Sequence, residues 1–242
     1  MAANETLLRE AICRYGRSLF ERGLTPGSSG NISYRLEDGG WLVTPTNASL
    51  GFLDPARLSR LDAQGRLLSG DVPTKEIPLH TALYDTRDGA RAVVHLHSTH
   101  SVAISMLPGI DPRDVLPPLT PYYLMRVGRT ALLPYYRPGD PAVAEAIRGL
   151  AGKYSSVLLS NHGPVVAGAD LEAAVFATEE LEETAKLFLL LRGMNPRGLD
   201  AAQVRDLVSV FKLDDAVGQL PAHGSCEAGH AGCAGHGQAV KD

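Results

Sequence analysis

The sequence predicts an α/β protein in which helices cover both sides of a mixed sheet. Two long segments, 4–23 and 170–192, carry apolar residues at helical spacing. Between them lie short apolar runs, such as 91–97 and 157–160, that are typical of strands. The chain has 242 residues, the length of one large domain or two small ones, and we expect one.

Composition narrows the class of protein further. Hydrophobic residues make up 44% and charged residues 21% of the chain, which excludes collagen-like, coiled-coil and wholly disordered proteins. The formal net charge of −4 argues against nucleic acid as a partner, because phosphate backbones are bound by basic surfaces. No run approaches the ~20 apolar residues of a membrane span, and the N-terminus lacks a signal-peptide pattern. Three cysteines at irregular spacing do not suggest a disulfide framework, so we expect a reducing cytoplasm and no membrane partner.

The N-terminal part is predicted to combine helices with hairpins. A helix over 4–23 is followed by a Gly/Ser turn that runs into a short strand within 24–36. Residues 41–44 form the second strand of a hairpin across the Asp38-Gly39-Gly40 turn. A short helical turn and another hairpin are expected over 54–70. Residues 74–87 then form a helix with Pro78 in its first turn, where proline is tolerated.

The C-terminal part is predicted to alternate strands and helices. A strand over 91–97 leads into a helix over 98–106. The proline-rich stretch 108–138 is expected to be loop, with an edge strand around 126–133. A helix over 141–153 precedes a buried strand at 157–160. In the helix over 170–192, Asp170 is the N-cap and Glu182 and Lys186 form an i,i+4 ion pair.

Composition also divides the chain into two segments. We expect residues 1–213 to form the folded domain and residues 214–242 to be a flexible tail rich in Gly, Ala, His and Cys. Binding of soft metal ions is the alternative role for the tail, because thiolates and imidazoles ligate such ions. Its candidate ligands are His223, Cys226, His230, Cys233 and His236.

Three histidines lie where strands are predicted to end. In the run Ala92-Val93-Val94-His95-Leu96-His97, strand alternation directs His95 and His97 to the same face, ~7 Å apart, where both can hold one metal ion. The alternative for this pair is a polar strand face. His162 follows the strand 157–160 and precedes a predicted Gly163-Pro164 turn. Three histidines with an open fourth position are typical of a catalytic zinc site.

Glu76 is the carboxylate that would complete this site. It lies at a predicted helix N-terminus, where the helix dipole favours negative charge, and this helix-stabilising role is compatible with catalysis. His80, one helical turn further on, is a competing ligand. His100 lies in the first turn of the next helix and is expected to be a structural or supporting residue.

Three turns rich in hydroxyl, amide and backbone N–H groups suggest an anion site. They are Gly27-Ser28-Ser29-Gly30-Asn31, Thr44-Pro45-Thr46-Asn47 and Pro73-Thr74-Lys75. A phosphate requires many converging donors of this kind. Each turn alone also fits an ordinary loop, and it is their joint presence ahead of the histidines that favours phosphate binding.

Five motifs resemble those of the class II aldolase/adducin family, in the same order, from about Gly23 to Gly193: GLTPGSSGNIS, WLVTPT, DVPTKE, AVVHLHSTHSVAIS and LLSNHGPVVAG. The resemblance implies a three-layer α/β/α fold with a mixed, largely antiparallel sheet, and a homotetramer. It also implies one zinc, or another divalent metal, held by His95, His97 and His162, with Glu76 near the metal as catalytic base. The residues that match the family's phosphate-binding turns are Ser28, Gly30, Asn31, Thr46, Asn47, Thr74 and Lys75.

Three further stretches, LTPYYLMRVGR, LLPYYRPGD and LEETAKLFLLLRG, resemble one branch of this family. That branch decarboxylates a four-carbon 3-oxo sugar acid phosphate to dihydroxyacetone phosphate and CO2 through a metal-stabilised enediolate. By this resemblance Tyr122 is the proton donor, with Tyr123 as the alternative. Thr74-Lys75 in place of a Ser pair, and Thr46-Asn47 in place of Thr-Gly, depart from the sugar-phosphate aldolases. An aldolase that releases an aldehyde instead of CO2 is the alternative function, followed by a non-catalytic, adducin-like binding module.

Overall fold

The computed structural model describes residues 2–194 and 196–213. The predicted tail, 214–242, lies outside these residues, so its role and the boundary between domain and tail stay predictions. None of the helices in the described ranges is long and apolar enough to cross a membrane.

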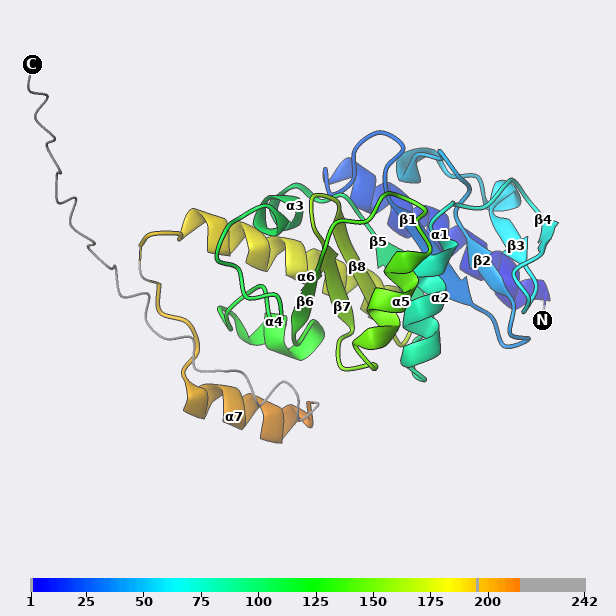
Figure 1. The fold of residues 1–242 in the computed structure, drawn as a ribbon. Coiled ribbons are helices and arrows are strands. Elements are labelled where there is room, and N and C mark those ends of the chain that lie inside the picture. Colours follow the sequence, from blue (N-terminus) through cyan, green and yellow to red (C-terminus); the bar gives the residue numbers. More distant parts are fainter. Residues whose placement is uncertain (1, 195, 214–242) are drawn as a thin grey trace, which may run out of the picture.

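The described strands form one mixed sheet. They are β1 (Asn31–Arg35), β2 (Trp41–Val43), β3 (Ser59–Leu61), β4 (Leu67–Ser69), β5 (Ala92–His95), β6 (Thr130–Leu133), β7 (Ser156–Leu159) and β8 (Gly163–Gly168). Their order in the sheet is β4-β3-β2-β1-β5-β8-β7-β6 (Figure 1). Neighbours pair antiparallel except β6 and β7, which are parallel. This confirms the mixed, largely antiparallel sheet.

The register brings several strand ends to the same end of the sheet. Asn31, the first residue of β1, pairs with His95, the last residue of β5. Gly163, the first residue of β8, pairs with Leu159, the last residue of β7. β2 and β6 also finish at this end. The segments that follow these four strands therefore meet the segments that precede β1 and β8. We call this the His95 end of the sheet.

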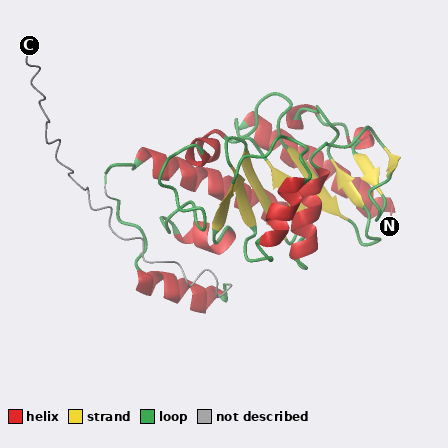
Figure 2. Ribbon diagram, viewed as in Figure 1, coloured by secondary structure: helices red, strands yellow, loops and turns green. Residues whose placement is uncertain are grey.

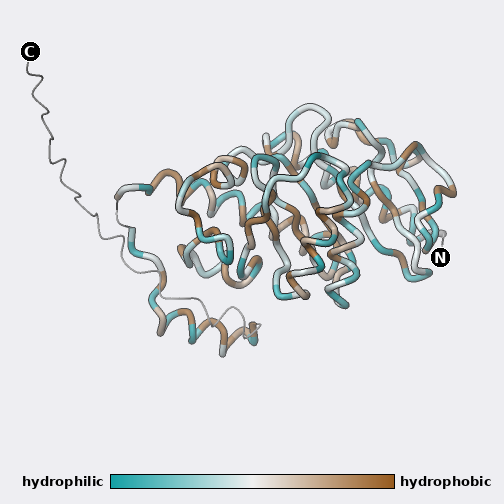
Figure 3. The backbone as a smooth tube through the Cα atoms, viewed as in Figure 1, coloured by the Kyte–Doolittle hydropathy of each residue, from teal (hydrophilic) through white to brown (hydrophobic). Residues whose placement is uncertain are grey.

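Helices cover both faces of the sheet, which confirms the α/β/α layers (Figure 2). They are α1 (Ala2–Glu21), η1 (Leu50–Phe52), η2 (Pro55–Arg57), α2 (Ile77–Thr86), α3 (Thr99–Ser105), α4 (Pro121–Arg126), α5 (Ala142–Gly149), α6 (Leu171–Leu190) and α7 (Ala201–Phe211). Val93 and Val165 pack under α2 and α5, whereas Val94 packs under α1 and α6 and Val166 under α3, α4 and α6. Successive residues of β5 and β8 therefore face opposite layers, and both strands are mostly apolar apart from His95 at the end of β5 (Figure 3).

Most predicted elements are confirmed to within a few residues, but two boundaries near the histidines are wrong. The strand predicted over 91–97 ends at His95, and the chain leaves the sheet before Ser98, the residue that precedes α3. Gly163-Pro164 is not a turn but the start of β8. Proline is accommodated there because its carbonyl still accepts the Leu96 N–H at 3.2 Å, and the N–H that it lacks falls beyond His95, where β5 has already ended.

Two α-helices of the described residues, besides the short η1, are absent from the sequence prediction. α4 lies in the proline-rich stretch expected to be loop; Thr120 caps it by accepting the Tyr123 N–H at 3.1 Å, and Pro121 occupies its first position. α7 begins with a capping box between Asp200 and Gln203. Both capping signals are local. α4 has only 6 residues, too few for apolar periodicity to identify it as a helix, whereas α7 carries apolar residues at helical spacing: Val204, Leu207, Val208 and Phe211.

Candidate active site

Four side chains converge at the His95 end of the sheet: Glu76, His95, His97 and His162. One potential ligand atom from each lies within 4.8 Å of those of the other three. His95 is the last residue of β5, His97 follows two residues later, and His162 lies in the β7–β8 turn. Glu76 is the residue immediately before α2. The structure thus brings together the metal-site residues predicted from the sequence.

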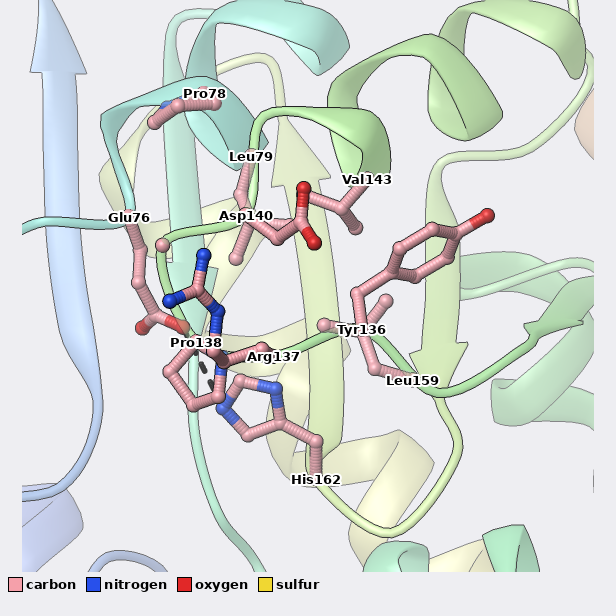
Figure 4. A pocket seen from close by; sticks show the side chains of 11 residues that line it. Glu76, Pro78, Leu79, Tyr136, Arg137, Pro138, Asp140, Val143, Leu159 and His162 are labelled. Atoms are coloured by element: carbon pink, nitrogen blue, oxygen red, sulfur yellow. Dashed lines mark ion pairs between the residues drawn. The ribbon is translucent and has the colours of Figure 1, made fainter.

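These four side chains, called the metal group below, lie close together. His95 Nε2 lies 3.2 Å from His97 Nε2 and 3.4 Å from Glu76 Oε2. Glu76 Oε1 lies 3.4 Å from His162 Nε2, and Figure 4 shows these two side chains facing each other. The centroids of the three imidazole rings are 4.7–5.0 Å apart. This is the spacing expected of side chains that share one small ion.

The pKa values of the three histidines favour the neutral imidazole, which is the form that ligates metal ions. Burial, followed by the proximity of the other histidines, lowers the pKa of His95 well below its ordinary value. Burial likewise lowers the pKa values of His97 and His162. The Nδ1–H of His95 donates to the Pro164 carbonyl at 2.8 Å, which leaves Nε2 with its lone pair toward the group.

Two buried atoms of this group have no hydrogen-bond partner in the described structure: Glu76 Oε1 and His162 Nε2. Leaving buried polar atoms unpaired costs free energy, about 1–3 kcal/mol each. A divalent cation among one carboxylate and three imidazoles would satisfy both atoms. These two unpaired atoms therefore indicate that the four residues fit a metal ion.

The backbone of the β7–β8 turn explains how His162 reaches the group. Asn161 adopts a left-handed conformation with φ 57°, which asparagine tolerates. A Cβ atom on Gly163 would lie 2.1 Å from the Leu96 carbonyl oxygen, so only glycine allows the turn to lie against the segment between His95 and His97.

His100 lies outside the metal group. Its Nδ1–H donates to Glu182 Oε1 at 2.8 Å, in agreement with a supporting role. Glu182 is 5% exposed and forms no pair with Lys186; the lysine lies 3.8 Å from Glu183 Oε1 instead. The predicted i,i+4 pair is wrong because Glu182 faces inward, where the N-terminus of α3 supplies better donors than solvated lysine.

The three predicted anion-binding turns all reach the His95 end. The Thr74 N–H donates to the Thr44 carbonyl at 3.2 Å, and the Thr46 N–H donates to the Val72 carbonyl at 2.9 Å, so the second and third turns lie side by side. Gly30 approaches closely, since a Cβ there would lie 2.9 Å from the His95 carbonyl oxygen. The remaining predicted members are exposed: Ser28, Asn47 and Lys75.

Asn31 and His80 have contacts that the sequence does not reveal. Asn31 Nδ2 donates to Glu76 Oε2 at 2.8 Å, and Asn31 Oδ1 lies 2.5 Å from His80 Nε2. His80 therefore contacts Asn31 and lies outside the metal group. Only one N–H of the Asn31 amide is left for a phosphate.

A cleft opens beside Glu76 and His162 (Figure 4). The segment after β6 forms one wall of it and brings in Arg137, an exposed residue whose guanidinium forms no ion pair with the described residues. The sequence predicts only a loop for this segment. The cleft is lined by Glu76, Pro78, Leu79, Tyr136, Arg137, Pro138, Gly139, Asp140, Val143, Leu159 and His162.

Tyr122 and Tyr123 lie on α4, away from the metal group of their own chain. Tyr123 is fully buried, and its Oη lies 3.4 Å from Oγ1 of Thr130, the first residue of β6. Because β6 runs from Thr130 toward the His95 end, Tyr123 marks the opposite end of the sheet. Tyr122 is 56% exposed, and the Arg126 guanidinium lies 5.7 Å from its ring centroid.

Known proteins share this fold and sequence. Residues 10–189 match the family described as Class II Aldolase and Adducin N-terminal domain. A Cupriavidus necator protein named 3-oxo-tetronate 4-phosphate decarboxylase is 54% identical over 190 residues, which cover 78% of this chain and 87% of that protein. An L-fuculose phosphate aldolase of Methanococcus maripaludis is 36% identical and covers 76% of this chain and 95% of its own. The crystal structure of YgbL from Escherichia coli has a TM-score of 0.81 at 48% identity, over 84% of this chain and 98% of that one.

The chain therefore belongs to the class II aldolase/adducin family. Within the family it is similar to proteins named 3-oxo-tetronate 4-phosphate decarboxylase, at 45–54% identity, and less similar to those named L-fuculose phosphate aldolase, at 32–36%.

Proposed function

We propose that this protein is a metal-dependent lyase that converts 3-oxo-tetronate 4-phosphate to dihydroxyacetone phosphate and CO2. The observation that carries the proposal is the group of Glu76 and three neutral histidines, in a chain 54% identical to a protein named for this reaction. A non-catalytic binding module is disfavoured, because a scaffold gains nothing from two unpaired polar atoms in its interior.

The reaction requires one bond to break and one proton to be added. The bond between C1 and C2 breaks, its electron pair moves toward the 3-oxo group, and C2 of the resulting enediolate is then protonated. A divalent metal, which we take to be zinc, would be held by His95, His97 and His162 with Glu76 beside it, and as a Lewis acid it would polarise the 3-oxo group. Glu76, beside the three histidines, is the acid–base group that we place at the metal, and a different group delivers the proton to C2.

The substrate is anionic at both ends, and the His95 end offers groups for both. We assign the phosphate to the turns that contain Ser28, Gly30, Asn31, Thr46, Asn47, Thr74 and Lys75, which supply backbone N–H groups, hydroxyls and one ammonium. Arg137 is then left for the C1 carboxylate, since its guanidinium forms no ion pair within the described part of the chain and lines the cleft beside Glu76.

We assign protonation of C2 to Tyr122, whose exposed hydroxyl is accessible to another molecule. Tyr122 lies at the opposite end of the sheet from its own metal group, so it can act only in the site of a neighbouring copy. A homotetramer, which the family resemblance implies, would supply that neighbour. Tyr123 is the weaker candidate because it is buried within its own chain.

The experiment that tests this function compares two substrate classes with the same purified, zinc-loaded protein. We expect kcat/KM for 3-oxo-tetronate 4-phosphate to exceed that for L-fuculose 1-phosphate by several orders of magnitude. Preference for the sugar 1-phosphate, with release of an aldehyde, would establish the aldolase alternative. Lack of activity on both, with the metal bound, would favour the binding module.

A further inference from the structure

A line of buried polar side chains leads from Glu76 into the core. It begins with the contacts of Asn31 to Glu76, at 2.8 Å, and to His80 Nε2, at 2.5 Å. The other ring nitrogen of His80, Nδ1, lies 2.7 Å from Ser33 Oγ, which in turn lies 2.8 Å from Tyr84 Oη. Ser33 and His80 are fully buried, and Tyr84 and Asn31 are only 2% and 5% exposed. The line therefore runs beyond the reach of solvent.

The chemistry of each group fixes the direction of these hydrogen bonds. An ionised carboxylate only accepts, so Asn31 presents its NH2 to Glu76 and its carbonyl to His80. His80 must then donate from Nε2–H. A neutral imidazole has a single N–H, so Nδ1 accepts from the Ser33 hydroxyl. The Ser33 oxygen in turn accepts from the Tyr84 hydroxyl at 2.8 Å, a shorter contact than the 3.4 Å from the same hydroxyl to the Arg91 carbonyl.

The surroundings of His80 keep its ring neutral. Complete burial, together with the nearby His95, lowers the pKa of His80 to about 3. Both ring nitrogens are occupied by Asn31 and Ser33, which is why His80 is not available as a metal ligand. The ring thus acts as a connector between a hydroxyl and an amide.

We propose that Asn31, His80, Ser33 and Tyr84 form one directed hydrogen-bond chain that positions the Glu76 carboxylate. The proposal rests on the role of Glu76 in the proposed function. The chain holds Oε2 and leaves Oε1 toward His162. If His80 did not hold the Asn31 carbonyl, the amide could turn over and present its oxygen to the carboxylate, which would repel it. The members are positioning residues, and Asn31 is the one that touches Glu76.

Two substitutions of His80 distinguish its role as a hydrogen-bond donor from a role in filling the core. His80→Leu fills the apolar space but removes the donor, and we expect kcat to fall about 10- to 100-fold with little change in KM or zinc content. His80→Gln keeps an N–H donor and should recover most of this loss. A residue that merely fills the core would give the reverse order, because leucine is the better filler.

The other links test whether the chain acts as a unit. Ser33→Ala should lower kcat on its own, yet cost almost nothing further when added to His80→Leu, since the chain is already broken. Tyr84→Phe, which keeps the ring against Trp41, should have the smallest effect because it removes the most distant link. The matched control is Thr178→Val on α6, a buried hydroxyl that donates to the Ala174 carbonyl; it should leave kcat unchanged.

The tautomer of His80 gives a readout that needs no substrate. We expect ¹H–¹⁵N NMR of the full-length protein, with His80→Gln for assignment, to show a proton on Nε2 and none on Nδ1. A proton on Nδ1, wild-type kcat in folded His80→Leu, or higher kcat in His80→Leu than in His80→Gln would each overturn the proposal. Failure of the proposed function would appear differently, as a wild-type protein that releases no CO2 while His80 keeps the Nε2–H form.

Discussion

Glu182, in the middle of α6, accepts hydrogen bonds from both the backbone N–H and the hydroxyl of Ser101, at 2.9 and 2.7 Å. The same carboxylate accepts the backbone N–H and the ring N–H of His100, each at 2.8 Å. α3 begins two residues after His97. A buried side chain of a distant helix therefore fixes the segment that directs His97 toward the metal group.

Loss of this carboxylate should be costly. Glu182→Ala removes the acceptor of the His100 and Ser101 backbone N–H groups, the Ser101 hydroxyl and the His100 ring N–H. We expect the free energy of unfolding to fall by about 3 kcal/mol. Urea unfolding of chelator-treated protein would measure it without a contribution from metal binding. The adjacent control, Glu183→Ala, removes only an exposed pair with Lys186 and should cost less than ~0.5 kcal/mol. Equal costs would contradict the role of Glu182.

Metal binding should depend on the predicted ligands and not on histidine in general. His97→Ala or His95→Ala is expected to release about one zinc per chain relative to the wild type, because two imidazoles and a carboxylate bind far more weakly than the full set. Metal analysis after dialysis against a mild chelator measures the difference. His100→Gln is the control and should retain the zinc. Full core zinc and activity in His97→Ala would refute the assignment.

Removing a residue of the proposed anion site should raise KM for the substrate. Lys75→Met removes an ammonium from the Thr74-Lys75 turn, and we expect KM for the phosphorylated substrate to rise roughly 10- to 150-fold, the value of a hydrogen bond to a charged group. Steady-state kinetics in low salt would measure it. Lys153→Met removes an exposed lysine near β7, at the opposite end of the sheet, and should leave KM unchanged. If both variants behave alike, the phosphate binds elsewhere.

The proton donor can be tested separately from binding. Tyr122→Phe is expected to lower kcat by about 10²–10⁴-fold, the usual contribution of general acid catalysis, while zinc content and KM stay near wild type. If Tyr123→Phe alone lowers kcat, the donor is the neighbouring tyrosine. Because Tyr122 would serve another copy, a mixture of Tyr122→Phe and inactive Glu76→Gln chains, unfolded and refolded together, should regain activity. Absence of such complementation would contradict the shared site.

Asp114 gives a pH dependence of stability that is unrelated to the metal. Burial raises its pKa to about 7, against the opposing effect of the Thr130 N–H and Arg129. A carboxyl whose pKa is raised by folding stabilises the protein fully below about pH 4, and this contribution is lost as the pH rises through 7. Between pH 5 and pH 8 we expect the wild type to lose about 2–3 kcal/mol relative to Asp114→Asn. A difference that does not change with pH would contradict the raised pKa.

Much of the fold follows from local sequence signals. The helices over 4–23 and 170–192 have clear apolar periodicity, and Asp170 caps α6 as predicted. The hairpin of β1 and β2 forms across the predicted Asp38-Gly39-Gly40 turn. The convergence of His95 and His97 can also be predicted from the sequence, because strand alternation places both side chains on one side. The prediction holds even though the strand ends at His95.

The remaining features depend on contacts between distant parts of the chain. Asn31 and Glu76 are 45 positions apart, and no local pattern shows that the amide holds the carboxylate instead of only a phosphate. The i,i+4 spacing predicts a solvated pair for Glu182, because spacing alone does not tell which face of α6 is buried. The sequence predicts a loop around Tyr122, whereas a capped helix holds this residue at the opposite end of the sheet.

The central claim is that the carboxyl carbon of the substrate leaves as CO2. The most direct measurement uses 3-oxo-tetronate 4-phosphate labelled with ¹³C at carbon 1, followed by ¹³C NMR with the zinc-loaded protein. We predict one labelled CO2 for each dihydroxyacetone phosphate formed, and neither product with Glu76→Gln. Label that stays in the unreacted acid, while L-fuculose 1-phosphate is split to dihydroxyacetone phosphate and an aldehyde, would contradict the account.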